Sequence, residues 1–205
     1  MRSADLFIYL DDVQYEKREF QNRNRIRTAR GWQYLTAPVL SKGRFSQKIS
    51  EVELDNSTAW RQEHLLALKT NYSRAPFFRE YFPELEKLYA GEYRLLAEVS
   101  MATAGFIAKK LGLNVPAKLS SSFKVEETSS VRLVSLCAAA GAGEYLSGSG
   151  ARAYLDAAAF SRAGIKLLWQ EFTPREYPQA FPGFEKDMSA LDLLLNCGPR
   201  SVEWL

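Results

Sequence analysis

An apolar run ends in two carboxylates within Leu10-Asp-Asp-Val-Gln-Tyr-Glu-Lys-Arg-Glu-Phe-Gln-Asn-Arg-Asn-Arg-Ile26, and alternating amides and guanidiniums follow at once. The apolar residues Phe7–Leu10 predict a buried strand. Asp11, Asp12 and Gln14 then lie at or just past the carboxyl end of that strand. Because open α/β sheets bind small ligands at the carboxyl ends of their strands, these three side chains are candidate ligand contacts.

Five arginines crowd the segment that follows, with two asparagines between them: Arg18, Arg23, Arg25, Arg27 and Arg30, with Asn22 and Asn24. Guanidinium groups are forked donors suited to phosphate or carboxylate, so the segment suggests an anionic small-molecule ligand. The alternative is a solvated surface, on which each exposed ion pair contributes only about 0–1 kcal/mol. The scarcity of lysine and the interleaved amides favour the ligand, because solvated faces usually carry Lys and Glu.

The composition is that of an ordinary soluble globular protein, with 46% of the 205 residues hydrophobic and 25% charged. A chain of this length suits a single domain over 1–205 and can bury a sizeable core without disulfides or metals. Met1–Asp5 enters the first strand directly, and no apolar run approaches the length of a membrane span. A cytoplasmic location without a membrane span is therefore expected.

Positive charge is concentrated near the N-terminus. Residues 1–50 carry a formal charge of +5, whereas residues 51–205 carry −2. This asymmetry fits a local anion site, but it falls short of the basic face expected of a dedicated duplex binder. Nucleic acid is therefore the less favoured partner.

The cysteines and the single histidine give no sign of a metal or redox site. Cys137 and Cys197 lie far apart in apolar settings without a CxxC pair, so they are interpreted as buried thiols. His64 would have to support a catalytic triad or a metal site alone, and we interpret it as a surface or packing residue. The sequence predicts no metal and no cofactor.

The order of elements predicts an α/β fold. Gly31 is a turn position between a polar loop and a β-rich stretch that begins at Trp32, which indicates a hairpin-like excursion. A helical section follows over 58–112, and strands then alternate with helices to about residue 172, as in parallel crossovers. The predicted fold is a mostly parallel sheet flanked by helices, with a helical insertion in the middle of the chain.

Hydroxyls and glycines close two later strands, Ser120–Ser122 and Ser147–Gly150. The second pattern precedes a predicted helix whose free N–H groups could receive an anion, but Gly-x-Gly also serves any tight turn. Asp192 and Asn196 share one face of a last predicted helix, which Ser189 caps and Gly198 ends. They either satisfy backbone groups and each other or line a pocket.

Several spaced motifs occur in order along nearly the whole chain: Asp11-Asp-Val-Gln-Tyr15, Gln21-Asn-Arg-Asn-Arg-Ile26, Tyr72 with Ala75-Pro76, Ser121-Ser122, Tyr145-Leu-Ser-Gly148 with Gly150-Ala151 and Tyr154-Leu-Asp156, Tyr177-Pro-Gln179, and Ser189 through Asn196 with Gly198. Together they resemble the WbqC-like family. The resemblance implies a bacterial cytoplasmic protein of surface polysaccharide biosynthesis, especially that of the O-antigen of lipopolysaccharide. It further implies a transferase that moves an acyl or aminoacyl group onto a nucleotide-activated amino sugar.

Roles for individual residues follow from that activity. Asp11 or Asp12 would act in catalysis, by orienting a sugar hydroxyl or by accepting an amine proton. Arg23 and Arg25 would hold a diphosphate or carboxylate, and Ser147–Gly150 would add backbone donors. The full set of expected substrate contacts is Gln14, Asn22, Arg23, Asn24, Arg25, Ser121, Ser147, Gly148, Gly150, Gln179, Asp192 and Asn196.

Two other functions stay open at this point. One is a non-catalytic nucleotide or sugar-phosphate binding protein, and the other is a single-stranded nucleic-acid binder that stacks bases on Phe20, Trp32 and Tyr34. The resemblance also implies a further strand and a Gln-Pro turn before Ala4-Asp5. A sheet without that strand would expose a pairing edge, which predicts poor solubility or a homodimer.

Overall fold

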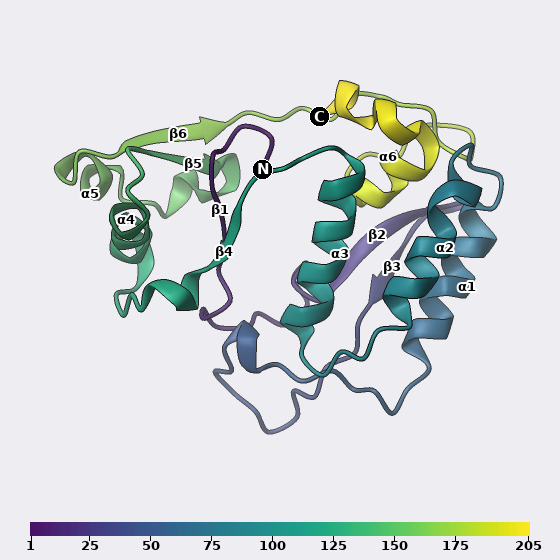
Figure 1. The fold of residues 1–205 in the computed structure, drawn as a ribbon, viewed down its shortest axis with the longest axis horizontal. Coiled ribbons are helices and arrows are strands. Elements are labelled where there is room, and N and C mark those ends of the chain that lie inside the picture. Colours follow the sequence, from purple (N-terminus) through teal and green to yellow (C-terminus); the bar gives the residue numbers. More distant parts are fainter. The chain divides into compact units, whose positions relative to one another are not determined.

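The computed structural model describes every residue from Met1 to Leu205, and the chain forms two compact units (Figure 1). Unit 1 consists of Met1–Asp12 and Val115–Thr173. Unit 2 consists of Val13–Asn114 and Pro174–Leu205. The chain therefore passes from unit 1 to unit 2 directly after the two carboxylates of the opening motif.

Unit 1 contains two parallel strand pairs. Strand β1 (Phe7–Tyr9) pairs with β4 (Ala117–Leu119), and β5 (Glu144–Gly148) pairs with β6 (Lys166–Gln170). Parallel partners need a crossover connection, and the short helix α5 (Ala157–Arg162) lies in the crossover from β5 to β6. The unit also has helix α4 (Ser129–Ala140) and the 3₁₀ turns η2 (Ser120–Phe123) and η3 (Ser149–Ala153).

A small apolar core holds the second strand pair in place. Phe160 of α5 is fully buried, and it contacts the buried residues Cys137 of α4 and Ile165. The ring of Tyr145, on β5, stacks on Phe160 with 5.2 Å between ring centroids. Cys137 is a free and buried cysteine, which confirms its interpretation as a buried thiol, and this burial raises the pKa of the thiol.

Unit 2 is organised around an antiparallel hairpin, whose turn at Gly31 was predicted but whose first strand lies in the segment predicted to be a polar loop. Strands β2 (Arg23–Thr28) and β3 (Gly31–Thr36) pair from Arg23 opposite Thr36 to Thr28 opposite Gly31. Gly31 has φ of +115°, a conformation that other residues rarely adopt, so glycine is needed there. Ile26 points from the hairpin into the main core.

Helices bury that face of the hairpin. The section 58–112, predicted to be helical, contains α1 (Trp60–Tyr72), α2 (Phe78–Tyr89) and α3 (Leu96–Lys110), and the C-terminal part adds α6 (Ala190–Cys197). Shorter 3₁₀ turns are η1 (Ile49–Glu51) and η4 (Gly198–Trp204). The core residues with least exposure include Leu68, Tyr72, Leu194 and Leu195.

Glycine is also required where α6 ends. A Cβ on Gly198 would lie 2.4 Å from the ring of Phe77, and the residue has φ of +57°. Ser189 caps the other end of α6 by accepting the N–H of Leu191. Both boundaries of this helix therefore agree with the sequence prediction.

The sheet itself differs from the prediction. The structure has three two-stranded sheets, two parallel and one antiparallel, in place of one large, mostly parallel sheet. The strands are only three to six residues long, and the hairpin buries its apolar face against helices of its own unit. Strand β1 is confirmed, but its three residues are half-buried and Leu10 is exposed, so the prediction of a fully buried strand was wrong.

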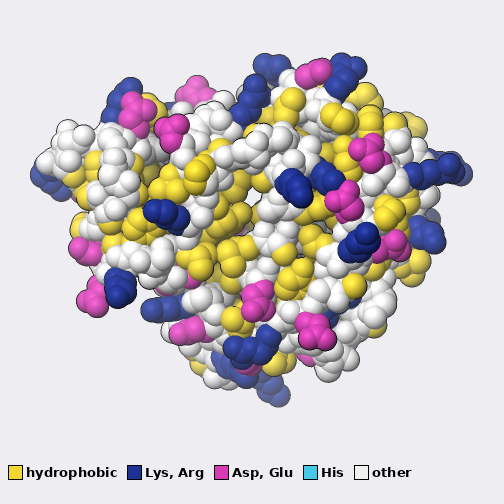
Figure 2. Space-filling view, in the orientation of Figure 1, with side chains coloured by type: hydrophobic (Ala, Val, Ile, Leu, Met, Phe, Trp, Pro, Cys, Tyr) yellow, Lys and Arg dark blue, Asp and Glu magenta, His cyan; other side chains and the backbone are white.

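The surface charges and the helix lengths can be compared with two expectations, that the chain has no broad basic face and that it has no membrane-spanning segment. In the face drawn in Figure 2, Lys and Arg side chains are interspersed with Asp and Glu and form no extended basic patch. None of the helices combines the length and the apolar character that crossing a membrane would need.

Candidate functional site

The first carboxylate of the opening motif is held by two serines. Tyr9 of β1 pairs with Leu119 of β4, so the residues that follow the two parallel strands lie side by side. Asp11 Oδ1 accepts hydrogen bonds from the Ser120 hydroxyl (3.1 Å) and the Ser121 N–H (3.0 Å), and its Oδ2 accepts from the Ser121 hydroxyl (2.7 Å). Asp11 and Ser121, both expected site residues, therefore do meet, but the carboxylate already receives three donors.

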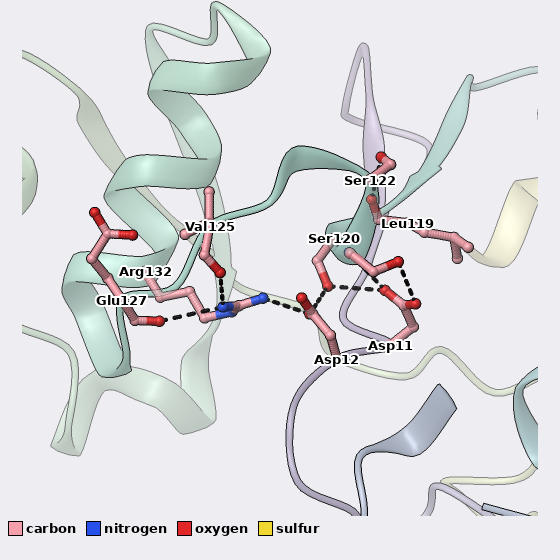
Figure 3. A network of polar contacts seen from close by, with 9 residues as sticks. Asp11, Asp12, Leu119, Ser120, Ser122, Val125, Glu127 and Arg132 are labelled. Carbon is pink, nitrogen blue, oxygen red and sulfur yellow. Dashed lines mark hydrogen bonds and ion pairs between the residues drawn. The ribbon is translucent and has the colours of Figure 1, made fainter. Parts of the chain in front are cut away.

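The second carboxylate is paired with an arginine that the sequence did not single out. Asp12 Oδ1 accepts from the Ser120 hydroxyl and forms an ion pair of 2.5 Å with Arg132 of α4. Figure 3 shows Ser120 between the two carboxylates and Arg132 reaching Asp12 from the other side. Arg132 also donates to the carbonyls of Val125 (2.6 Å) and Glu127 (3.3 Å).

These contacts decide the ionisation of Asp12. Burial raises the pKa of Asp12, but the hydrogen bonds from Ser120 and Arg132 and the charge of Arg132 outweigh burial and hold it below its ordinary value. Asp12 is thus a carboxylate at neutral pH. Both contacts use Oδ1 of Asp12, which leaves Oδ2 for other donors.

The serine–glycine pattern at the end of β5 forms a tighter structure than expected. Ser147 is buried and Gly148 ends the strand, after which η3 begins at once as a five-residue 3₁₀ turn that includes Gly150. The next α-helix starts only at Ala157. A long helix with aligned free N–H groups therefore does not follow these glycines.

The outer side of the β2–β3 hairpin carries arginines stacked on aromatic rings. We name Phe20, Arg23, Arg25, Trp32 and Tyr34 the hairpin face. The guanidinium carbon of Arg23 lies 4.3 Å from the ring centroid of Tyr34, and that of Arg25 lies 4.3 Å from Trp32. Arg25 is also 5.7 Å from both Phe20 and Tyr34, so three rings surround it.

Neither arginine of the hairpin face is neutralised by a carboxylate. The ion pairs of the structure join other residues, such as Arg132 with Asp12 and Arg94 with Glu53. Arg23 donates to the Arg18 carbonyl, and the buried Nε atoms of Arg23 and Arg25 have no hydrogen-bond partner. Two positive charges are therefore held in fixed positions by rings and, for Arg23, by one backbone carbonyl, without a carboxylate.

The amides of the same segment serve local structure. Asn22 Nδ2 donates to the Ala37 carbonyl (2.9 Å), and Asn24 Oδ1 accepts the N–H of Arg25 (2.8 Å). Gln14 forms an isolated bridge with Lys48. The hairpin face thus contains Arg23 and Arg25 from the expected set, while the amides shape the strand that carries them.

A buried carboxylate connects the hairpin to the C-terminal part of unit 2. Asp192 is 0% exposed and accepts from the Tyr72 hydroxyl (2.7 Å), the Tyr177 hydroxyl (2.7 Å) and Gln179 Nε2 (3.0 Å). Asn196 donates to the carbonyl of Asp192 (2.8 Å). Gln179, Asp192 and Asn196 are therefore brought together, but they bind each other and two tyrosines.

Burial sets the ionisation of this cluster. It raises the pKa of Asp192 above its ordinary value, although the hydrogen bonds from Tyr72, Tyr177 and Gln179 oppose the rise. Burial and the neighbouring Asp192 also raise the pKa values of Tyr72 and Tyr177, so both phenols keep their protons. The phenols are thus donors to the carboxylate and do not act as bases.

The histidine is buried among aromatic residues. His64 Nε2 lies 3.1 Å from the Thr36 carbonyl, which can only accept, so Nε2 carries the hydrogen and Nδ1 accepts from the Tyr89 hydroxyl at 3.2 Å. Burial lowers the pKa of His64 and raises the pKa of Tyr89 to about 12. The packing interpretation of His64 is confirmed, and no group of three His, Cys, Asp or Glu side chains is arranged to hold a metal ion.

One groove of unit 2 was not predicted. It has a volume of about 680 Å³ and lies between α1 and the loop that follows α2, where its polar lining includes Asn56, Arg61, Gln62, Glu86 and Tyr93. Arg61 is held by Asn56 Oδ1 (2.9 Å). These residues lie on unrelated segments, so no local motif announces them.

Comparisons with known proteins agree with the motifs. The model of the WbqC-like protein family matches residues 1–204. An uncharacterized protein of Mycobacterium tuberculosis, Rv1507c, is 39% identical over 204 residues, which are 98% of this chain and 88% of that protein. No solved structure matches significantly. The chain thus belongs to the WbqC-like protein family, which is associated with polysaccharide biosynthesis.

Proposed function

We propose that this protein binds the diphosphate of a nucleotide-activated amino sugar on the hairpin face and takes part in the modification of that sugar for a surface polysaccharide. The family association supplies the pathway. The carrying observation is that Arg25 is surrounded by three rings and has no carboxylate partner. A charge in that position is available to an anionic ligand.

The geometry around Arg25 suits phosphate. Rings attract a guanidinium through their negative faces, which holds the group without using its N–H donors. The outer N–H groups can then bind two oxygens of one phosphate, and Arg23 adds a second charge on the same strand face. A diphosphate is the ligand whose charge matches two neighbouring guanidiniums.

The reaction supported by the family resemblance is acyl or aminoacyl transfer to the amine of the sugar. In that reaction a C–N bond forms, the bond from the acyl carbon to its carrier breaks, and the amine loses a proton. Within unit 1, Asp12 is the carboxylate with an oxygen left for a further donor, because Asp11 already receives three hydrogen bonds. With its lowered pKa, Asp12 is suited to bind an ammonium or hydroxyl group more than to act as a strong base.

The test is a binding titration by calorimetry with UDP-, GDP- and dTDP-sugars and with inorganic pyrophosphate. Arg25→Ala should weaken binding of all these ligands at least tenfold, since a hydrogen-bonded charge pair contributes about 1.5–3 kcal/mol. Arg30→Ala is the matched control, because it removes the same charge from the turn of the same hairpin without touching the rings. Equal effects of the two variants, or no binding of any ligand by the folded protein, would contradict the proposal.

A second candidate is a single-stranded nucleic-acid binder, which the exposed rings of Phe20 and Trp32 beside Arg25 favour. An oligonucleotide included in the titration separates the two functions. Nucleic-acid binding should weaken steeply with added salt and should exceed the affinity for any mononucleotide. A nucleotide-sugar that binds more tightly than the oligonucleotide at moderate salt supports the first function.

A further inference from the structure

Two aromatic rings of the hairpin face are exposed to solvent as well as contacting the arginines. Phe20 is 54% exposed and Trp32 is 42% exposed, although both belong to residue types that are usually covered. They are the exposed neighbours of Tyr34, with which each forms an edge-to-face contact, at 6.2 Å for Phe20 and 5.0 Å for Trp32. The exposed part of this group is therefore apolar and lies next to two charges that no carboxylate neutralises.

The register of the hairpin places the charges and the rings in rows. Arg25 is opposite Tyr34 and Arg27 is opposite Trp32, and directly opposed residues of an antiparallel pair share one face. Successive side chains on one face of a strand lie about 7 Å apart. A ring and a guanidinium in adjacent rows can thus contact two parts of one small ligand.

We infer that the indole of Trp32 stacks on the base of a nucleotide whose diphosphate is bound by Arg25 and Arg23. The inference rests on the proposed function and adds the nucleoside as a recognised part of the ligand. Bases stack on aromatic rings regardless of their identity, because every base has a π-face, so the site recognises that a nucleoside is present and discriminates weakly among bases. Phe20 borders the same apolar area beside Arg25.

The nucleoside contribution is measured by comparing UDP with inorganic pyrophosphate in calorimetric titrations of wild type, Trp32→Ala and Trp32→Phe. Trp32→Ala should weaken UDP binding roughly 5- to 150-fold, as expected for one lost base stack, and leave pyrophosphate binding unchanged. Trp32→Phe should keep most of the affinity for UDP, since it keeps a ring. Phe45→Ala is the matched control, because Phe45 is an exposed ring of the same unit that also lies beside a cation, Lys17.

The outcomes separate this inference from the function on which it rests. If Trp32→Ala weakens UDP and pyrophosphate equally, Trp32 only positions Arg25 and the stacking inference is wrong. If Trp32→Ala binds UDP as tightly as Phe45→Ala does, the base lies elsewhere, while the diphosphate site stands. If wild type binds neither UDP nor pyrophosphate, the proposed function and the inference both fail.

Discussion

Arg25 and Arg27 lie two residues apart on the same face of strand β2, yet only the guanidinium of Arg27 is hydrogen-bonded within the fold. Arg27 is 4% exposed and donates to the carbonyls of Gly31 (2.8 Å), Pro182 (2.7 Å) and Thr28. Arg25 is stacked among rings and binds no carbonyl or carboxylate through its side chain. Arg27 thus links the C-terminal segment to the hairpin through the Pro182 carbonyl, whereas Arg25 keeps N–H donors that a ligand could use.

The difference shows what separates a structural charge from a ligand-binding charge in this protein. Structural charges are used up inside the fold, as with Arg27 and its carbonyls or Arg132 and Asp12 in unit 1. The charges of Arg23 and Arg25 are fixed in position without being neutralised. Each prediction below tests that distinction through stability, where structural charges should matter and the others should not.

The largest effect is expected for Arg27→Ala. The variant loses hydrogen bonds from a buried charged donor to three carbonyls, each about 1.5–3 kcal/mol, and the effects are not additive. The free energy of unfolding should fall by about 3–5 kcal/mol, measured by urea unfolding followed by circular dichroism. Arg27→Lys keeps the positive charge but loses the forked guanidinium, so its free energy of unfolding should lie between those of Arg27→Ala and wild type. A loss of stability below about 1 kcal/mol would mean that Arg27, like Arg25, contributes little to the stability of the fold.

A smaller loss is expected for Tyr72→Phe. The Tyr72 hydroxyl donates to Asp192 and accepts the N–H of Arg27 (2.8 Å), so its removal leaves two buried polar groups without that partner. The expected loss of stability is about 1–3 kcal/mol in the same unfolding experiment. Tyr177→Phe is the matched variant, because its hydroxyl is only partly buried, and it should cost less. The reverse order would mean that the hairpin does not depend on Asp192.

The sequence predicted the turn at Gly31, the helices of the middle section and both ends of α6 because those features depend on local signals such as Gly31, Ser189 and Gly198. The sequence did not predict which strands pair, because pairing depends on the tertiary contacts that bury one face of each strand. It also treated the five arginines alike. Whether an arginine finds carbonyls, as Arg27 finds Pro182 from far along the chain, depends on tertiary contacts that leave no local pattern.

The sequence predicted some contacts of the candidate site and missed others. The meeting of Asp11 with Ser121 follows from two strand ends that the sequence placed, because parallel strands end on the same side. Arg132 was missed since one arginine on a helix carries no signal of its carboxylate partner. The tyrosines around Asp192 were missed because aromatic residues at helical spacing usually indicate core packing alone.

The ion pair of unit 1 should appear as pH-dependent stability. The pKa of Asp12 is lowered in the folded state, so its stabilisation is complete above the unfolded value of about 4 and is lost as pH falls through the lowered value. Asp12→Asn should therefore reduce stability by about 1 kcal/mol at pH 7, with the gap to wild type closing below about pH 4. Urea unfolding at several pH values measures the gap.

Asp192→Asn supplies a contrast of opposite sign. The pKa of Asp192 is raised by burial, so the stability that its protonated form contributes is present below about pH 4 and is lost as pH rises through the raised value. Wild type should thus gain stability relative to Asp192→Asn as pH falls, whereas it loses stability relative to Asp12→Asn. Parallel pH dependences for the two variants would contradict the assigned contacts.

The smallest effect on stability is expected for Arg25→Ala. Its guanidinium has no carboxylate partner, and half-exposed arginines away from buried networks usually change stability by no more than about 0.5 kcal/mol when replaced. Part of that small change should be favourable, because the variant removes repulsion between Arg25 and Arg23 on one strand face. A loss of ligand binding without a loss of stability would identify Arg25 as a residue kept for its partner, since a structural arginine would lose both. A stability loss equal to that of Arg27→Ala would instead show that the rings hold Arg25 as part of the fold, and the distinction between the two arginines would fail.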